Sequence, residues 1–393
     1  MYTLITFIGK VHNKSGKYQT AKYRFSDNSV KETSLFGIAL QEKLQVERLV
    51  VLGTSGSMWG VFVESFDLQD ELIEKHSLLI DNANNDNDND QFTQEQLDKL
   101  APLLEKKLGI SCELRLIPYG ENEIEQADIL QAIAKGIKEG DKVALDITHG
   151  LRHLPVITLI SAFYLSRVYK VNIEGLYYGA FEMRQRHGEI VPVLKLDGLL
   201  NIANWVSALD SFDKDGDYDV FSELLEKDGM AKNKAELLKK AAFYERNFNL
   251  SKSNDALNSI DISSVNLTGI TGVLFKDALE KRFKKSKGSS ILERQKKLAE
   301  FYINNRDYVR GVIFLFEAFI TSKMPCPSHD YKERNRVKEE YDTGKGCDAY
   351  KKLREIRNAL AHGNEPSQTI KQYLKSEDEL RRFLKKARTE LFN

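Results

Sequence analysis

Cysteine is scarce in this sequence, with three residues in a chain of 393, at positions 112, 326 and 347. Such wide spacing matches neither a disulfide framework nor a metal-binding motif, and so few thiols fit a reducing compartment. No apolar run approaches the roughly 20 residues that span a bilayer, and the stretch 2–9 lacks the basic start of a signal peptide. We therefore expect a cytoplasmic protein with no bound metal and no membrane segment.

An excess of charge is also missing, because Lys+Arg and Asp+Glu both number 58. The chain as a whole has no bulk attraction for nucleic acid, so any site for a polyanion must be a local patch. With 41% hydrophobic and 30% charged residues, the composition is that of a globular protein. The length predicts two or three domains, which we place at 1–200, 201–300 and 301–393.

The first 200 residues alternate between β-rich apolar runs and segments of helical period. This alternation predicts an α/β, Rossmann-like domain with a mostly parallel sheet and helices on both faces. Thr93 and Gln96 form the pattern of a capping box, and the acidic run 81–90 is too polar to pack, so we expect a mobile loop there. The expected strands are 3–9, 48–54, 112–118, 142–147, 172–178 and 189–196, with an edge hairpin at 17–25, and the expected helices are 34–44, 93–108, 121–138 and one ending near 169.

After about residue 198 the strand signal fades, which predicts an all-α remainder. Glu317 interrupts an apolar segment, so we expect its carboxylate either to reach solvent or to pair with a partner. The stretch 323–350, rich in Pro, Gly and charge, is expected to be a long loop. Helical period marks the segments 201–209, 221–250, 276–301 and 307–322, followed by a helix that stops at Gly363 and a charged closing helix.

Three loops follow predicted strand ends, after Ile8, after Leu52 and after Ile147. In doubly wound sheets such loops meet at one edge, where helix N-termini bind phosphates. The stretches 52–59 and 146–155 combine glycine, which permits close backbone approach, with hydroxyl, histidine and arginine donors. Neither a dinucleotide fingerprint nor a P-loop is present. We predict a phosphate-containing ligand here, and the alternative is that these residues only make tight turns.

A second polar group lies at the helix end before Gly363, namely Arg357, Asn358 and His362. Asn358 and His362 are four positions apart and share a helix face, whereas Arg357 lies about 100° round from Asn358. Arginine binds phosphate oxygens and histidine transfers protons near neutral pH, so this pair suits attack on a phosphodiester. The alternative is that Arg and His only complement the negative end of the helix.

Leu-Gly-Thr-Ser-Gly-Ser-Met-Trp at 52–59 and Asp-Ile-Thr-His-Gly-Leu-Arg-His-Leu-Pro at 146–155 resemble loop motifs of CARF domains in CRISPR-associated proteins of type III systems. Arg-Asn-Ala-Leu-Ala-His at 357–362 is similar to the Arg-x4-His motif of the HEPN superfamily. CARF followed by HEPN is the order found in the accessory ribonucleases of these systems. Together the resemblances cover most of the chain.

This resemblance implies a metal-independent endoribonuclease that cleaves single-stranded RNA in antiviral defence, leaves 2′,3′-cyclic phosphate and 5′-OH ends, and spares DNA. The implied activator is a cyclic oligoadenylate, the tetra-adenylate ahead of the hexa-adenylate, bound across the two-fold axis of a homodimer or a larger oligomer, with no other cofactor. Slow cleavage of the activator, known of some CARF domains, is a further expectation. The resemblance assigns catalysis to Arg357, Asn358 and His362, and ligand binding to Gly9, Thr54, Ser57, Met58, Trp59, Thr148, His149, Gly150 and Arg152.

Two other functions are open at this point. A HEPN toxin-like ribonuclease would be active at all times and restrained by an antitoxin, but such a toxin has no need of a large N-terminal sheet domain. A ligand-gated regulator without catalysis would sense through the sheet domain and dock a partner through the helical one, but it has no need of Arg357, Asn358 and His362 together.

Overall fold

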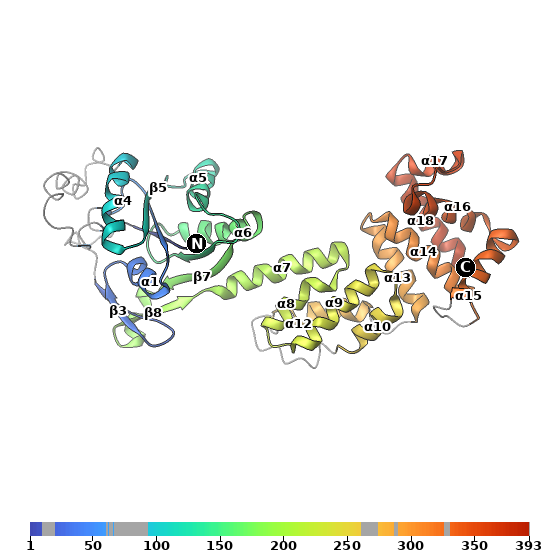
Figure 1. The fold of residues 1–393 in the computed structure, drawn as a ribbon, viewed down its shortest axis with the longest axis horizontal. Coiled ribbons are helices and arrows are strands. Elements are labelled where there is room, and N and C mark those ends of the chain that lie inside the picture. Colours follow the sequence, from blue (N-terminus) through green and yellow to red (C-terminus); the bar gives the residue numbers. More distant parts are fainter. Residues whose placement is uncertain are drawn as a thin grey trace. The chain divides into compact units, whose positions relative to one another are not determined.

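The computed structural model describes residues 1–9, 20–59, 62, 66, 93–260, 274–286, 290–325 and 331–392. It divides into two compact units, an N-terminal unit Met1–Asn201 and a C-terminal unit Ile202–Asn393 (Figure 1). The first of these ends within one residue of the predicted boundary at 200. The acidic run 81–90, expected to be a mobile loop, lies outside the described residues.

The N-terminal unit contains an eight-stranded sheet in the order β3-β2-β8-β7-β6-β1-β4-β5 (Figure 1). The five strands from β5 to β7 are parallel neighbours, whereas β8 runs antiparallel to β7, and β2 and β3 form an antiparallel hairpin at the edge. The predicted α/β domain with a mostly parallel sheet is confirmed. The strands are β1 (Tyr2–Phe7), β2 (Ala21–Arg24), β3 (Val30–Thr33), β4 (Arg48–Gly53), β5 (Ser111–Leu116), β6 (Lys142–Asp146), β7 (Asn172–Gly179) and β8 (Ile190–Lys195).

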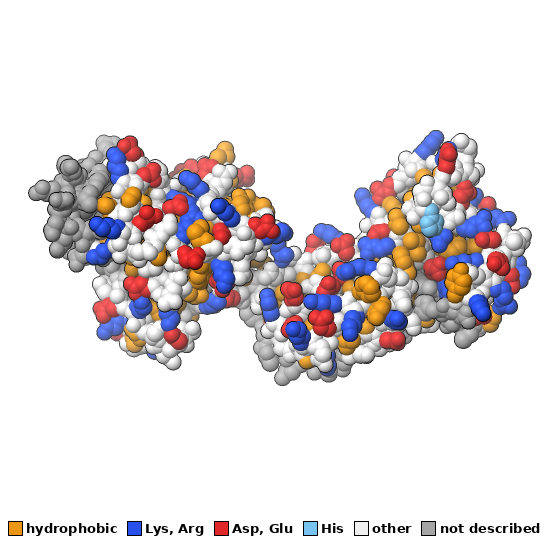
Figure 2. Space-filling model, in the orientation of Figure 1, with side chains coloured by type: hydrophobic (Ala, Val, Ile, Leu, Met, Phe, Trp, Pro, Cys, Tyr) orange, Lys and Arg blue, Asp and Glu red, His pale blue; other side chains and the backbone are white. Residues whose placement is uncertain are grey.

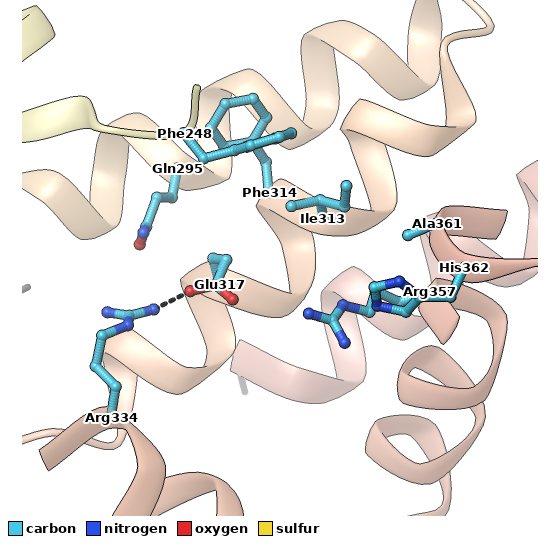
Figure 3. Close-up of a pocket in the computed structure, with 9 residues that line it drawn as sticks. All are labelled: Phe248, Gln295, Ile313, Phe314, Glu317, Arg334, Arg357, Ala361 and His362. Atoms are coloured by element: carbon cyan, nitrogen blue, oxygen red, sulfur yellow. Dashed lines mark hydrogen bonds and ion pairs between the residues drawn. The ribbon is translucent and has the colours of Figure 1, made fainter. Parts of the chain in front are cut away.

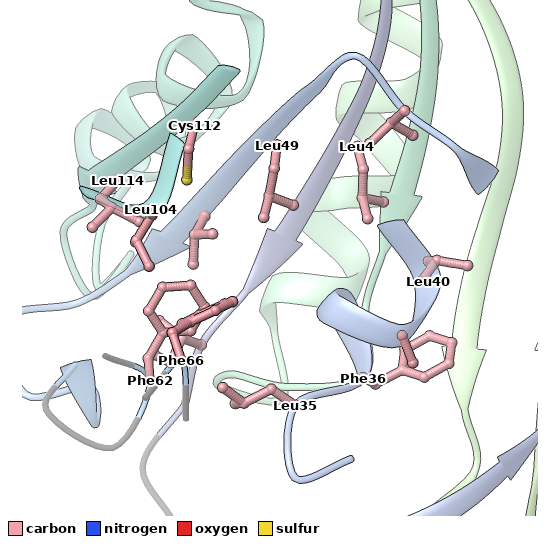
Figure 4. Close-up of a cluster of buried hydrophobic side chains, with 14 of the residues drawn as sticks. Leu4, Leu35, Phe36, Leu40, Leu49, Phe62, Phe66, Leu104, Cys112 and Leu114 are labelled. Carbon is pink, nitrogen blue, oxygen red and sulfur yellow. The ribbon is translucent and has the colours of Figure 1, made fainter. Parts of the chain in front are cut away.

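Helices cover both faces of this sheet. Successive residues of a strand point to opposite faces, so neighbours in the chain pack against different helices. Leu4 and Leu49 pack in one cluster with α1 (Phe36–Leu44) and α4 (Gln94–Leu108) (Figure 4). Ile5 and Val50, their neighbours in the chain, pack in the other cluster with α5 (Glu123–Ala134) and α6 (Leu154–Val168). Burial on both faces explains why β4 is apolar from Leu49 to Leu52, and why β1 has only apolar residues and threonine, rather than an alternating pattern.

The C-terminal unit is helical and holds two buried clusters. One centres on Trp205 and Phe221, and the other on Phe316 and Tyr350, with α14 at its middle. Both clusters lie in one compact unit, and the subdivision at residue 300 stays a prediction. The boundary between the units lies in α7 (Asp197–Asp215). The helices that follow are α8 (Ser222–Lys227), α9 (Lys232–Arg246), α10 (Leu250–Asn258), α12 (Lys276–Ser286), α13 (Ile291–Asn304), α14 (Tyr308–Ser322), α15 (Tyr331–Glu340), α16 (Asp348–His362), α17 (Gln368–Leu374) and α18 (Glu377–Phe392). A short 3₁₀ turn, η1 (Phe181–His187), lies in the N-terminal unit, and another, η2 (Tyr218–Phe221), lies in the C-terminal unit.

The long loop expected at 323–350 is wrong, because this stretch contains α15 and a π-helical turn at Tyr341–Lys345. Composition alone favoured a loop, since Val337 is the only residue of α15 that is buried. Tertiary contacts hold the helix instead. Arg334 forms an ion pair with Glu317 of α14, and the ring of Tyr341 meets that of Phe319 edge-on. Of the two outcomes expected for Glu317, the structure shows pairing with a partner.

Several other helical segments have different bounds from those expected. The segment 201–209 lies within the longer α7, and 276–301 is divided between α12 and α13. The segment 221–250 is split between α8 and α9, because the chain turns at Gly229, whose φ of 103° is readily adopted by glycine. The helix expected at 121–138 stops at Ala134, shortly before Gly136, which has a φ of 75°. Charge is mixed over the surface, and Figure 2 shows acidic and basic side chains interspersed on the visible face of each unit, in keeping with the balanced composition.

The capping box of α4 gives a test of the local chemistry. The Thr93 hydroxyl accepts a hydrogen bond from the Gln96 N–H, and the Gln96 side chain accepts one from the Thr93 N–H. Thr93→Ala should lower the free energy of unfolding of the N-terminal unit by about 1 kcal/mol, measured by urea denaturation. Thr389→Ala, an exposed position inside α18, is the control and should change stability by less than about 0.5 kcal/mol. Equal effects of the two substitutions would contradict the cap.

Candidate functional site

The loops after β1, β4 and β6 meet at one edge of the sheet. β1 lies between β4 and β6 and runs parallel to both, so the carboxyl ends of the three strands are adjacent, at the point where the strand order reverses. The first and third loops touch through their backbones, since a Cβ placed on Gly9 would lie 2.7 Å from the amide nitrogen of Gly150. Glycine at position 9 is therefore required by this contact.

The loop after β4 is held by hydrogen bonds to its own backbone and to the first loop. Ser57 Oγ accepts from the Thr54 N–H at 3.0 Å and donates to the Ile8 carbonyl at 3.0 Å. The Met58 N–H donates to the Gly9 carbonyl at 3.1 Å, and the indole N–H of Trp59 donates to the Thr54 carbonyl at 2.9 Å. Thr54, Ser57 and Trp59 are buried, and Met58 is half-buried. The buried side chains thus set the shape of the loop.

Asp146, at the end of β6, ties the third loop to the sheet. Its carboxylate accepts from Thr6 Oγ1 at 2.6 Å and from the Thr148 N–H at 2.8 Å, and Thr148 Oγ1 accepts from the Gly179 N–H at 2.8 Å. Burial raises the pKa of Asp146 to about 6, against the lowering effect of these hydrogen bonds. Sequence reasoning did not identify this residue as part of the site, although a carboxylate that ends an apolar strand is a recognisable signal.

The rest of the third loop divides into anchored and exposed residues. His149 Nε2 accepts from the Phe36 N–H at 3.3 Å, and burial lowers the pKa of His149 to about 4, so the ring is neutral and acts as an acceptor near pH 7. His153 Nε2 lies 2.7 Å from the Tyr119 carbonyl. Gly150, with a φ of 104°, and Arg152 are exposed. The structure therefore brings all nine predicted ligand residues to one edge, with Gly150 and Arg152 facing solvent.

The second polar group lies on α16, which stops where the sequence predicts. Gly363 has a φ of 67°, and its N–H donates to the Ala359 carbonyl at 3.1 Å. Arg357 and His362 line a cavity of about 280 Å³ within the C-terminal unit (Figure 3). Phe248, Gln295, Ile313, Phe314, Glu317, Arg334 and Ala361 complete the lining.

Electrostatics inside this cavity favour an anion next to Arg357. Its guanidinium donates from Nη1 to Asn358 Oδ1 at 2.9 Å and lies 5.3 Å from the ring centre of Phe316. Asn358 is neutral, so the hydrogen bond orients Arg357 without cancelling its charge. The one acidic residue of the lining, Glu317, pairs with Arg334 and, at 3.6 Å, with Lys338. The pocket thus holds an arginine, a residue type suited to binding phosphate, and a histidine, a residue type suited to transferring protons.

Within the described ranges, no three His, Cys, Asp or Glu side chains gather as a metal site would need. None of the helices in those ranges is long and apolar enough to cross a bilayer.

Comparison with known proteins gives two similarities. Residues 3–182 match the family described as "CRISPR system endoribonuclease Csx1, CARF domain", a stretch that includes all three loops. The chain is also 27% identical over 381 residues to the CRISPR-associated protein MJ1674 of Methanocaldococcus jannaschii. That alignment covers 88% of this chain and 59% of the relative, so the chain spans less than two thirds of the length of the curated protein it matches.

The buried carboxylate of Asp146 predicts that the free energy of unfolding depends on pH in an unusual direction. Below pH 3.8 it is protonated whether folded or unfolded, and between pH 3.8 and about 6 the folded state keeps the proton longer. Its contribution to stability therefore falls as pH rises through this window, by roughly 3 kcal/mol. Asp146→Asn, which cannot ionise, should gain stability relative to the wild type between pH 4 and pH 7 in urea titrations. Asp128→Asn, exposed on α5, is the control, and a parallel pH profile for both variants would refute the assignment.

Proposed function

Because residues 3–182 match the CARF domain family of CRISPR system endoribonucleases, we propose that this chain is an endoribonuclease activated by a cyclic oligoadenylate. The observation that carries the proposal is the shared pocket of Arg357 and His362, which pairs an anion-binding cation with a proton-transfer group. The matched CARF domain supplies the activator class. The system is antiviral defence by a type III CRISPR mechanism, and the substrate is single-stranded RNA.

The N-terminal unit suits a phosphate-containing ring because its loops offer backbone rather than bulky side chains. Gly9 allows the first loop to pack directly on the backbone of Gly150, so no side chain of either residue covers this edge of the sheet. Arg152 is exposed near the start of α6, where an arginine meets ligand phosphates favourably. We propose that the tetra-adenylate is preferred to the hexa-adenylate, and that two copies of the chain form a homodimer which binds the ring across its two-fold axis.

The proposed chemistry needs only side chains of this chain. The ribose 2′-OH loses a proton and attacks the adjacent phosphorus, while the bond to the leaving 5′-oxygen breaks and that oxygen gains a proton. His362 transfers a proton in this step, and Arg357 stabilises the charge that develops on the phosphoryl oxygens. The products carry a 2′,3′-cyclic phosphate and a 5′-OH. DNA lacks the attacking hydroxyl and is not a substrate.

The direct test is RNA cleavage by the purified protein with cyclic tetra-adenylate, with cyclic hexa-adenylate and with neither, in buffer containing EDTA. The proposal expects cleavage with the tetra-adenylate at lower concentration than with the hexa-adenylate, and none without activator. Equal cleavage with and without activator would favour a constitutive, toxin-like ribonuclease. Binding of the activator without any cleavage would favour a non-catalytic regulator. Loss of cleavage in EDTA that one divalent ion restores would contradict the metal-independent mechanism.

Substitution of Arg357 or His362, the two of the three catalytic candidates that line the pocket, should remove turnover and spare folding. His362→Ala should lower the rate of RNA cleavage about 10²–10⁴-fold, because it deletes the proton-transfer group, and Arg357→Ala should also lower it strongly. Both side chains line an open pocket rather than the core, so thermal stability and activator affinity should stay near those of the wild type. Arg382→Ala, exposed on α18, is the control. Activity within a few-fold of wild type for His362→Ala would remove this residue from the mechanism.

Substitution in the loop after β6 should weaken activation and leave the rate of cleavage at saturating activator unchanged. A ligand shifts a conformational equilibrium only by its differential affinity for the two states, so Arg152→Ala and Thr148→Ala should raise the activator concentration needed for half-maximal cleavage. Cleavage at saturating activator should be unchanged. Lys106→Ala removes an exposed cation from α4 and serves as the control for charge. Binding and cleavage titrations on the same proteins decide the matter: unchanged midpoints for both sensor variants would exclude the loop after β6 from the ligand site.

A further inference from the structure

One side chain of the α16 pocket is buried without a hydrogen-bond partner. Gln295, on α13, is 4% exposed, and its Oε1 accepts no hydrogen bond in the described structure. It lines the same cavity as Arg357 and His362. Figure 3 shows its amide directed toward the side of the pocket where Arg334 and Glu317 lie, with Arg357 and His362 on the opposite side. A buried, unpartnered amide oxygen is unfavourable, and a native chain that keeps one calls for an explanation.

The position of this amide is fixed by the helix that carries it. Arg294, the preceding residue, is 2% exposed and donates to Glu245 Oε2 at 2.6 Å and to Ser253 Oγ at 2.9 Å. This buried ion pair joins α13 to α9 and α10. The backbone that carries Gln295 is thereby held in place, and burial of the side chain limits where its amide can turn.

The wall beside Gln295 is aromatic. Phe248 is half-buried, and its ring centre lies 5.0 Å from that of Phe314. Phe248 has a φ of 57°, an uncommon conformation for a residue other than glycine. Residues held in such conformations cluster at ligand sites. The cavity therefore combines an aromatic surface and a buried amide with the arginine and histidine of the proposed chemistry.

Unpaired RNA bases are recognised by this combination, in which the base packs on an aromatic ring while its edge forms hydrogen bonds. A glutamine amide offers an acceptor and a donor side by side, which match an N–H and an adjacent acceptor on a base edge. We propose that Gln295 and Phe248 form a subsite for the nucleobase next to the scissile phosphate, so that the enzyme prefers certain bases at its cut site. This inference rests on the proposed ribonuclease function.

The experiment compares cut sites made by the full-length, activator-bound protein on an RNA of random sequence, mapped by sequencing the product ends. The wild type should show a base preference at one position beside the cut. Gln295→Leu should weaken that preference roughly tenfold while cleavage continues. Gln295→Glu replaces the amide donor with a second acceptor and should change which base is preferred. Gln372→Leu, the same substitution at an exposed site on α17, should retain the wild-type pattern.

Thermal unfolding separates this role from a structural one. Gln295→Leu removes an unsatisfied oxygen, so its midpoint should equal or exceed that of the wild type. If Gln295 were needed only for packing, its replacement by leucine would lower the midpoint and leave the cut-site pattern intact. The inference is overturned if the wild type shows no base preference, or if Gln295→Leu keeps the wild-type preference.

Binding distinguishes failure of this inference from failure of the proposed function. Fluorescence anisotropy with short homopolymeric RNAs of each base requires no cleavage. Selective binding by the wild type that Gln295→Leu abolishes would support the base subsite even if no RNA were cut. Equal binding of all four RNAs by the wild type, or selectivity that survives in Gln295→Leu, would refute the subsite whether or not cleavage is found.

Discussion

The parallel pairing of β1 with β4 on one side and with β6 on the other is the constraint on which the N-terminal unit depends. Three strands that end together force three turns into a small space, and Gly9 fits there because a side chain would strike the backbone of Gly150. Hydroxyl groups then fix the turns, since Ser57 and Thr148 bind main-chain atoms. A ligand at this edge therefore meets mainly backbone groups and an exposed rim that includes Arg152.

The C-terminal unit forms its pocket in the opposite way, from charged side chains beside an apolar wall. α14 supplies both, because Phe314 is buried in the core while Glu317, one turn on, reaches the cavity. A carboxylate in that position is tolerable because two cations, Arg334 and Lys338, pair with it. Arg357 is oriented by the neutral amide of Asn358, which leaves the charge of the guanidinium uncancelled by this hydrogen bond.

The fold was predictable from the sequence wherever local chemistry decides it. Burial on both faces demands continuous apolar strands, so 48–53 stands out, and the helix end at Gly363 follows from the need for a left-handed residue. Long-range partners decided the rest. Asp146 accepts a hydrogen bond from Thr6, which lies 140 positions away in the chain. Helix α15 is held by the salt bridge between Arg334 and Glu317. Gln295 lies in an amphipathic helix, where nothing in the sequence distinguishes it from a surface residue.

Asp146 and Gln295 show two different outcomes for a buried polar group. Asp146 accepts hydrogen bonds from two residues of its own chain, so its burial is accounted for by the fold of the sensor loop. The buried oxygen of Gln295 accepts none within the described residues, so folding alone does not account for it. It faces a cavity that already holds an arginine and a histidine. The missing donor then belongs to a molecule that enters the pocket, and the side chain is explained by binding rather than by stability.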